Sequence, residues 1–141
     1  MTTQVSVRVD VPTILVPEVD DDVIAGWIEA RLNNARNHFI MQMARGGGGG
    51  RVYRRGQKFH RASAPGEYPV TDGGRLANSV SIQMTDKLEG RLSSDVEYAE
   101  YLTSGTSRMA PRKMLADALQ EMMERRPMFT DLARAAHWTR R

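Results

Sequence analysis

The stretch DDVIAGWIEARLNNARNHFIMQMAR, residues 21–45, decides the fold that this sequence predicts. Apolar side chains recur in it every three or four positions, the spacing of one face of an α-helix. Acidic residues at its start suit the positive end of the helix dipole, and an Asp there can cap the first turn. We therefore expect a long helix from about Asp21 to Arg45 that lays one apolar stripe on a sheet. The stripe consists of Ile24, Trp27, Ile28, Leu32, Ala35, Phe39 and Met43.

Residues on either side of this helix predict the strands of that sheet. From Gln4 to Val11, valines alternate with polar residues, which is the period of a half-buried strand. Residues 81–84 and 88–93 predict two further strands, joined around Asp86 and Lys87 as in a hairpin. Strands joined by a short turn run in opposite directions, so we expect an antiparallel sheet.

The later helices are predicted to be shorter. Residues 72–79 predict a capped helical turn, and residues 96–102 suit a short helix or a bent segment that stops at Gly105. Pro111 precedes a C-terminal amphipathic helix, and Pro127 separates it from a final amphipathic piece, Phe129 to Trp138. The apolar face of the C-terminal helix holds Met114, Leu115, Ala118, Leu119 and Met122.

Length and composition narrow the class of protein. A chain of 141 residues suits one domain with a single core. The lack of cysteine excludes a disulfide framework, a thiol nucleophile and a cysteine zinc site. The sequence shows neither a signal peptide nor the ~20 consecutive apolar residues needed to cross a bilayer. We therefore expect a soluble α+β protein without membrane contact, a single domain over residues 1–141. Its antiparallel β-sheet is packed by the long N-terminal helix and the C-terminal helix.

Residues 46–74 form a long extended arm in this interpretation. Five consecutive glycines end the long helix, and nothing periodic follows until about Thr71. The arm is basic at Arg51, Arg54, Arg55, Lys58 and Arg61, without an acidic residue from 51 to 61. Such a run is either a solvated face or an arm that meets nucleic acid or an acidic partner.

An ordered arm needs an anchor, because fixing one residue costs roughly 1–2 kcal/mol of backbone entropy. The arm holds few large apolar side chains that could offset this cost. We hypothesise that they anchor it on a neighbouring subunit. These side chains are Val52, Tyr53, Phe59 and Tyr68.

Two blocks of sequence carry a resemblance to a known family. The first is RRGQKFHRASAPGEYPVTDGGRLANSV, residues 54–80, and the second combines Tyr98-Ala99, Gly105-Thr106 and Ala110-Pro111-Arg112. In order and spacing, these blocks resemble the neck and tail-completion proteins of long-tailed bacteriophages, over about the last two thirds of the chain. Such proteins usually continue with a Pro and an aromatic residue where this chain has Lys113-Met114.

The resemblance implies a structural virion protein, assembled in the host bacterial cytoplasm, that forms a homo-oligomeric ring where the tail joins the head. Six copies are expected, with twelve as the alternative. The expected partners are the head connector, the tail-tube or tail-terminator proteins, and double-stranded DNA that passes non-specifically through the lumen. As interface and arm contacts we assign Arg51, Tyr53, Arg54, Arg55, Lys58, Phe59, Arg61, Pro65, Gly66 and Tyr68. As a structural corner beside the interface we assign Gly73, Gly74, Tyr98, Tyr101, Gly105 and Thr106.

The sequence does not favour an enzyme, a cofactor or a metal site. His60, Ser63 and Asp72 are the residue types of a hydrolase triad, but nothing places Ser63 on a strained turn between a strand and a helix. The glycine run lacks the Gly-Lys-Ser/Thr ending of a phosphate-binding loop. The alternative function is a small nucleic-acid-binding module. In it, basic residues of the 51–61 arm pair with phosphates while Tyr53 and Phe59 stack on bases.

Overall fold

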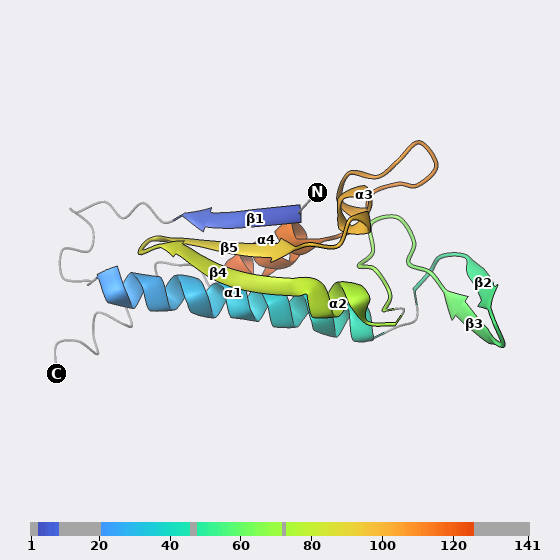
Figure 1. Cartoon of the computed structure of the whole chain (residues 1–141), viewed down its shortest axis with the longest axis horizontal. Coiled ribbons are helices and arrows are strands. Elements are labelled where there is room, and N and C mark those ends of the chain that lie inside the picture. Colours follow the sequence, from blue (N-terminus) through green and yellow to red (C-terminus); the bar gives the residue numbers. More distant parts are fainter. Residues whose placement is uncertain (1–2, 9–20, 46–47, 72, 126–141) are drawn as a thin grey trace.

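A long helix lies beneath a three-stranded sheet, and a two-stranded hairpin projects from one end (Figure 1). The computed structural model describes residues 3–8, 21–45, 48–71 and 73–125. In chain order the elements are β1 (Thr3–Arg8), α1 (Asp21–Ala44), β2 (Val52–Arg55), β3 (Lys58–Arg61), α2 (Arg75–Ser79), β4 (Val80–Asp86), β5 (Glu89–Ser94), α3 (Tyr98–Ser104) and α4 (Leu115–Arg125).

The sheet is antiparallel, which confirms the prediction, and the structure adds its strand order, β1-β5-β4. The central strand β5 places Leu92 between Val5 of β1 and Ile82 of β4. Gly90 of the same strand lies so close to Leu32 and Ile28 of α1 that a Cβ atom there would displace them. The missing side chain therefore lets the long helix lie directly against the middle of the sheet.

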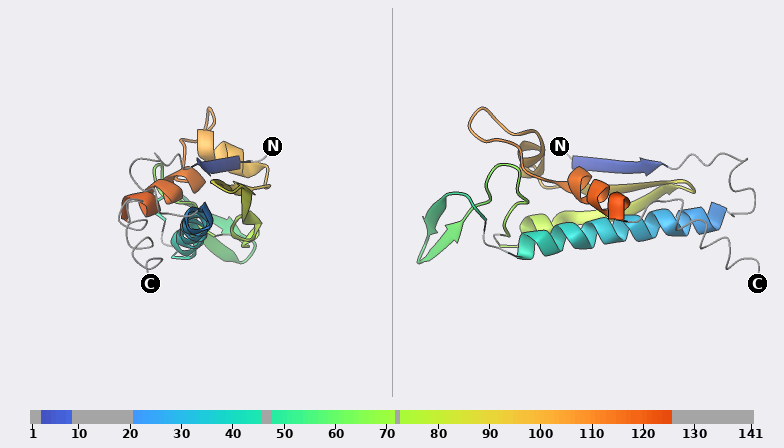
Figure 2. Two further views of the ribbon diagram at one scale, coloured as in Figure 1. Left: turned by 90° about the vertical axis from the view of Figure 1, so that its left-hand side faces the viewer. Right: turned by 180° about the vertical axis from the view of Figure 1, so that it is seen from behind.

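The core forms between α1, α4 and the sheet, and the two helices lie side by side (Figure 2). Removing a large apolar side chain from water contributes about 1.5–3 kcal/mol, so the stripe on α1 provides much of the stability. The predicted α+β architecture, with its long N-terminal helix and its C-terminal helix, is thereby confirmed. Fully buried members of the core include Ile28, Leu32, Phe39, Leu92 and Leu115.

A polar cluster also joins α1 to α4. His38 Nε2 lies 2.7 Å from Glu121 Oε2 and must donate, since an ionised carboxylate only accepts. Lys113 Nζ donates to the other oxygen of Glu121 at 3.0 Å. Burial by itself raises the pKa of Glu121, but the hydrogen bonds from His38 and Lys113 outweigh it and hold that pKa below its ordinary value. The hydrogen bond between His38 and Glu121 therefore joins the two helices in addition to their apolar packing.

The segment after the glycine run differs from its predicted form. No regular structure was expected from 46 to about 71, whereas β2 and β3 pair there as an antiparallel hairpin. The physical reason is a two-residue turn, Gly56-Gln57, between Arg55 and Lys58. Residues 9–11 of the first predicted strand, Asp72, and the predicted piece 129–138 lie outside the described residues. Within the described helices, none is long and apolar enough to cross a membrane.

Candidate interaction site: the hairpin and the groove at its base

The β2–β3 hairpin depends on its turn. Gly56 has a φ of 62°, and none of the described residues other than glycine has a positive φ. A positive φ at the first turn position alone is the pattern of a type II′ turn, whose twist matches that of the paired strands. Arg54 Nε donates to the Gly56 carbonyl at 2.8 Å and holds the turn closed. The hairpin therefore forms from local interactions.

The two faces of the hairpin carry different side chains. Tyr53 pairs with His60, and their rings lie 5.3 Å apart on one face. Arg54 pairs with Phe59, and Val52 with Arg61, on the opposite face. Phe59 is 77% exposed, far more than is usual for a side chain of its size.

The base of the hairpin packs closely against the end of the glycine run. Gly50 N–H donates to the Ala62 carbonyl, and Ala62 N–H donates to the Arg51 carbonyl, each at 3.0 Å. A Cβ atom at Gly50 would collide with the carbonyl oxygens of Ala62 and Ser63. At least here the glycine is needed for close packing and is not simply linker sequence.

Two charged side chains hold this base in its conformation, Glu67 from within the segment and Arg112 from outside it. One Glu67 oxygen accepts from the backbone N–H groups of Ala64, at 2.7 Å, and Gly49, at 2.9 Å. These hydrogen bonds, that from Ala64 above all, lower the pKa of Glu67. Arg112 reaches across from the loop before α4 and donates to the Ser63 hydroxyl and the Ser63 carbonyl, each at 3.0 Å.

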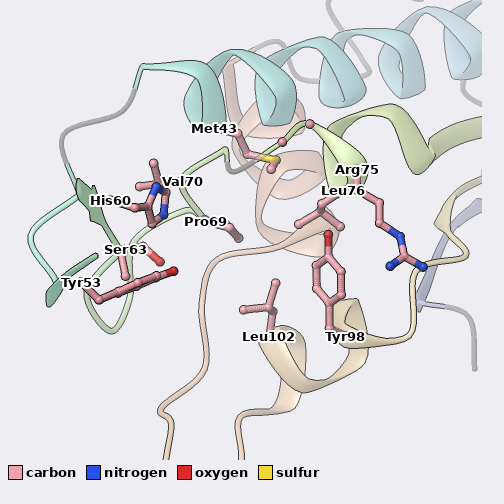
Figure 3. Close-up of a pocket in the computed structure, with 13 residues that line it drawn as sticks. Met43, Tyr53, His60, Ser63, Pro69, Val70, Arg75, Leu76, Tyr98 and Leu102 are labelled. Carbon is pink, nitrogen blue, oxygen red and sulfur yellow. The ribbon is translucent and has the colours of Figure 1, made fainter. Parts of the chain in front are cut away.

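A groove of about 500 Å³ opens between the hairpin and α3 (Figure 3). Tyr53 and His60 form its hairpin side, while Tyr98 and Leu102 of α3 lie on the opposite side. The Arg75 guanidinium lies 6.0 Å from the Tyr98 ring centre, within the range of a cation–π contact. The volume of the groove falls within the ~300–1,000 Å³ typical of binding pockets.

The residues assigned to the structural corner are not all in one place. Gly73, Gly74 and Tyr98 line the groove, whereas Gly105 and Thr106 form the tight loop after α3. That loop closes through hydrogen bonds from Gly105 N–H to Tyr101 and from Thr106 N–H to Met109. The assigned glycines with positive φ are Gly66, Gly73, Gly74 and Gly105, at 76–77°.

Most assigned arm residues lie on the hairpin, but not all of them. Arg51, Arg54, Lys58 and Arg61 are exposed, and the backbone of Arg55 pairs with that of Lys58. Pro65 and Gly66 lie in the turn below the hairpin, where Gly66 N–H donates to the Pro111 carbonyl. Tyr68 packs inside its own chain, edge-on to Phe39 and His38 at 5.9 and 5.8 Å. Its hydroxyl has a pKa well above the ordinary value, because of its burial and the nearby Glu121 carboxylate.

Sequence reasoning did not assign Arg112, Ser63 and Glu67 as the groups that anchor the arm. Ser63 is only 8% exposed, and its hydroxyl is engaged by Arg112. The one available signal was that Arg112 and Glu67 belong to the two blocks that carry the family resemblance.

The site has features for binding and no assembled catalytic group among the described residues. His60 and Ser63 both line the groove, but Asp72, the third residue of the triad considered above, is not described. No three His, Cys, Asp or Glu side chains in the described part of the chain converge to hold a metal ion. Comparison of the chain with known protein families, with curated proteins and with solved structures finds no significant match.

Proposed function

We propose that this chain is a structural virion protein of a tailed bacteriophage, a head–tail connector or tail-completion subunit. Copies form a homo-oligomeric ring in the neck, join the tail to the head, and leave a lumen through which double-stranded DNA passes. The subunit makes and breaks no covalent bond in this role. Its role is structural, because the same contact between neighbouring subunits is repeated around the ring.

The observation that carries this proposal is the contact between the two blocks of sequence that suggested it. Arg112 of the second block binds both the hydroxyl and the carbonyl of Ser63 in the first. Lys113 N–H donates to the Glu67 carbonyl at 3.0 Å, so a further pair of positions meets there. Residues 49 positions apart, one in each block, therefore meet at the base of the projecting hairpin.

The hairpin itself supports a role in assembly. An isolated two-stranded hairpin is marginally stable in water, and here its base is fastened to the body by the Arg112 side chain and by the hydrogen bond from Lys113 N–H to the Glu67 carbonyl. It nevertheless presents Phe59 and four exposed basic side chains to solvent. A rigidly based arm with an uncovered aromatic ring is suited to contact another molecule.

Electron microscopy of a lysate tests the proposal. The gene is disrupted in the phage that encodes this chain, and particles are counted with and without a complementing copy. Filled heads beside unattached tails, restored to joined particles by the complementing copy, are expected. Normal virions from the disrupted phage would refute a head–tail joining role.

The exposed basic residues also favour a second candidate, a nucleic-acid-binding hairpin. Arg51, Arg54, Lys58 and Arg61 could pair with phosphates while Phe59 stacks on a base. Binding by such a module should fall by orders of magnitude between about 50 and 200 mM salt. Fluorescence anisotropy with single- and double-stranded DNA decides between the two, because the neck subunit should show little affinity for either.

A further inference from the structure

Among the residues that the structure describes, none covers Phe59. It pairs with Arg54, and strand alternation places it on the face opposite Tyr53 and His60. Since Tyr53 and His60 line the groove, the same alternation directs Phe59 away from it. Phe59 is 77% exposed, so it is available to a second molecule.

The segment around α3 has the charge that the hairpin lacks, although its acidic residues lie outside the groove lining, where Arg75 is the one charged side chain among the described residues. Segment 95–104 contains Asp95, Glu97 and Glu100 and no basic residue, while segment 51–61 is basic and contains no acidic residue. Asp95 and Glu97 are exposed and Glu100 is partly exposed. Helix α3 also presents aromatic surface, with Tyr101 58% and Tyr98 38% exposed. Both charge and apolar surface are therefore complementary between the hairpin and α3.

We propose that the groove between the hairpin and α3 of one copy receives the β2–β3 hairpin of a second copy. Phe59 enters beside Tyr98, and Arg61, which shares its face, lies near Glu97. The occupant is a second copy because one chain carries both surfaces and the geometry of its hairpin keeps its own Phe59 out of its own groove.

The contact is heterologous, since the hairpin and the groove are different surfaces. Contacts of this kind extend head to tail and close into a ring where the rotation allows. The inference rests on the proposed ring and identifies the two surfaces that would build it. It adds that the α3 side, and not the hairpin alone, determines which chain can be a neighbour.

Crosslinking between single-cysteine variants tests the placement, because the chain has no native cysteine. Gln57→Cys marks the hairpin turn and Thr103→Cys marks α3, and both sites are exposed. The two variants, one of them enlarged by a tag, are co-expressed and treated with a short bismaleimide. We expect a mixed-mass product that disappears when Phe59→Ser is added to the Gln57→Cys chain. Ala30→Cys, at an exposed site on α1, replaces Thr103→Cys as the control and should give no such product.

A charge exchange tests the recognition, with sedimentation velocity as the measurement. Arg61→Glu should weaken self-association about tenfold, and so should Glu97→Lys. A chain with both substitutions should recover it, since attraction is restored with reversed signs. Phe59→Ser alone should weaken association by about tenfold or more, as expected for losing a buried aromatic side chain.

Each outcome bears on the docking separately from the proposed function. Assembly that persists in every hairpin and α3 variant would refute the docking while leaving the neck role intact. A wild-type chain that stays monomeric would also refute it, because a second copy would not be the occupant. Loss of head–tail joining on gene disruption tests the function whichever result the association experiments give.

Discussion

Replacing Arg112 by alanine should release the base of the arm without unfolding the core. The substitution removes both hydrogen bonds to Ser63 and leaves the Ser63 hydroxyl and carbonyl without those donors. A hydrogen bond from a charged group contributes about 1.5–3 kcal/mol. Arg112 is partly exposed, so we expect about 2 kcal/mol for the pair, near the lower limit of that range.

Hydrogen exchange measures this loss at particular amides. The N–H groups of Gly50 and Ala62 form the first hydrogen bonds at the base of the hairpin. A loss of about 2 kcal/mol corresponds to roughly 30-fold faster exchange there. Amides of the buried stripe in α1, such as that of Phe39, should keep their wild-type rates.

Two variants control the experiment. Arg108→Ala removes an exposed arginine from the same loop and should change neither amide. Arg112→Lys keeps the charge but cannot donate to both Ser63 oxygens in the same geometry, so it should resemble the alanine variant. Unchanged exchange at Ala62 in Arg112→Ala would show that the arm is held by something else.

The structure also predicts the effect of four other substitutions on stability. Gly50→Ala should destabilise the protein by about 1–3 kcal/mol through its collision with nearby carbonyls. Gly26→Ala, where a Cβ meets nothing, should stabilise α1 by up to about 1 kcal/mol. Thermal unfolding in which Gly50→Ala and Gly26→Ala change the stability in the same direction would contradict these expectations. Leu92→Ala should cost about 2–5 kcal/mol in urea unfolding, because its side chain is fully buried; a loss well below that range would mean that β5 is not central to the core. The lowered pKa of Glu67 means that its contribution is complete above its ordinary value of 4.5 and is lost as the pH falls through the folded value. The stability difference between wild type and Glu67→Gln should therefore be present near neutral pH and vanish in acid, and a difference that persists in acid would count against the assigned hydrogen bonds.

Local patterns gave the architecture reliably. The apolar stripe predicts α1 within one residue of its observed C-terminus, because helix periodicity needs no information from elsewhere in the chain. The alternation and turn residues around Asp86 and Lys87 predict the β4–β5 hairpin for the same reason. Both elements also bury the faces that the sequence marks as apolar.

The hairpin was missed because its strands have no apolar face to reveal them. Arginine and lysine occupy positions where a half-buried strand would show valine or isoleucine. The glycine at position 56 did signal a turn, but a solvated β-ribbon and an irregular loop look alike in such a sequence.

The anchoring of the arm could not be predicted from the sequence at all. Arg112 and Ser63 meet only because the chain folds back over 49 positions, and no periodic pattern describes such a contact. The close approach at Gly50 is equally non-local, since the colliding atoms belong to Ala62 and Ser63. From the sequence alone, the five consecutive glycines at positions 46–50 had the composition of a flexible linker.

The separation between Arg112 and Ser63 has a consequence for synthesis on the ribosome. The hairpin closes through neighbouring residues, so it can form as soon as residue 61 has emerged. Its direction is not fixed until Arg112, translated much later, is available to bind Ser63. In a nascent chain shorter than 112 residues, the hairpin therefore lacks the contact that sets its orientation. A chain that includes Arg112 can hold the hairpin at a constant angle. The order of translation therefore fixes the direction of the hairpin only after the chain up to Arg112 has been made.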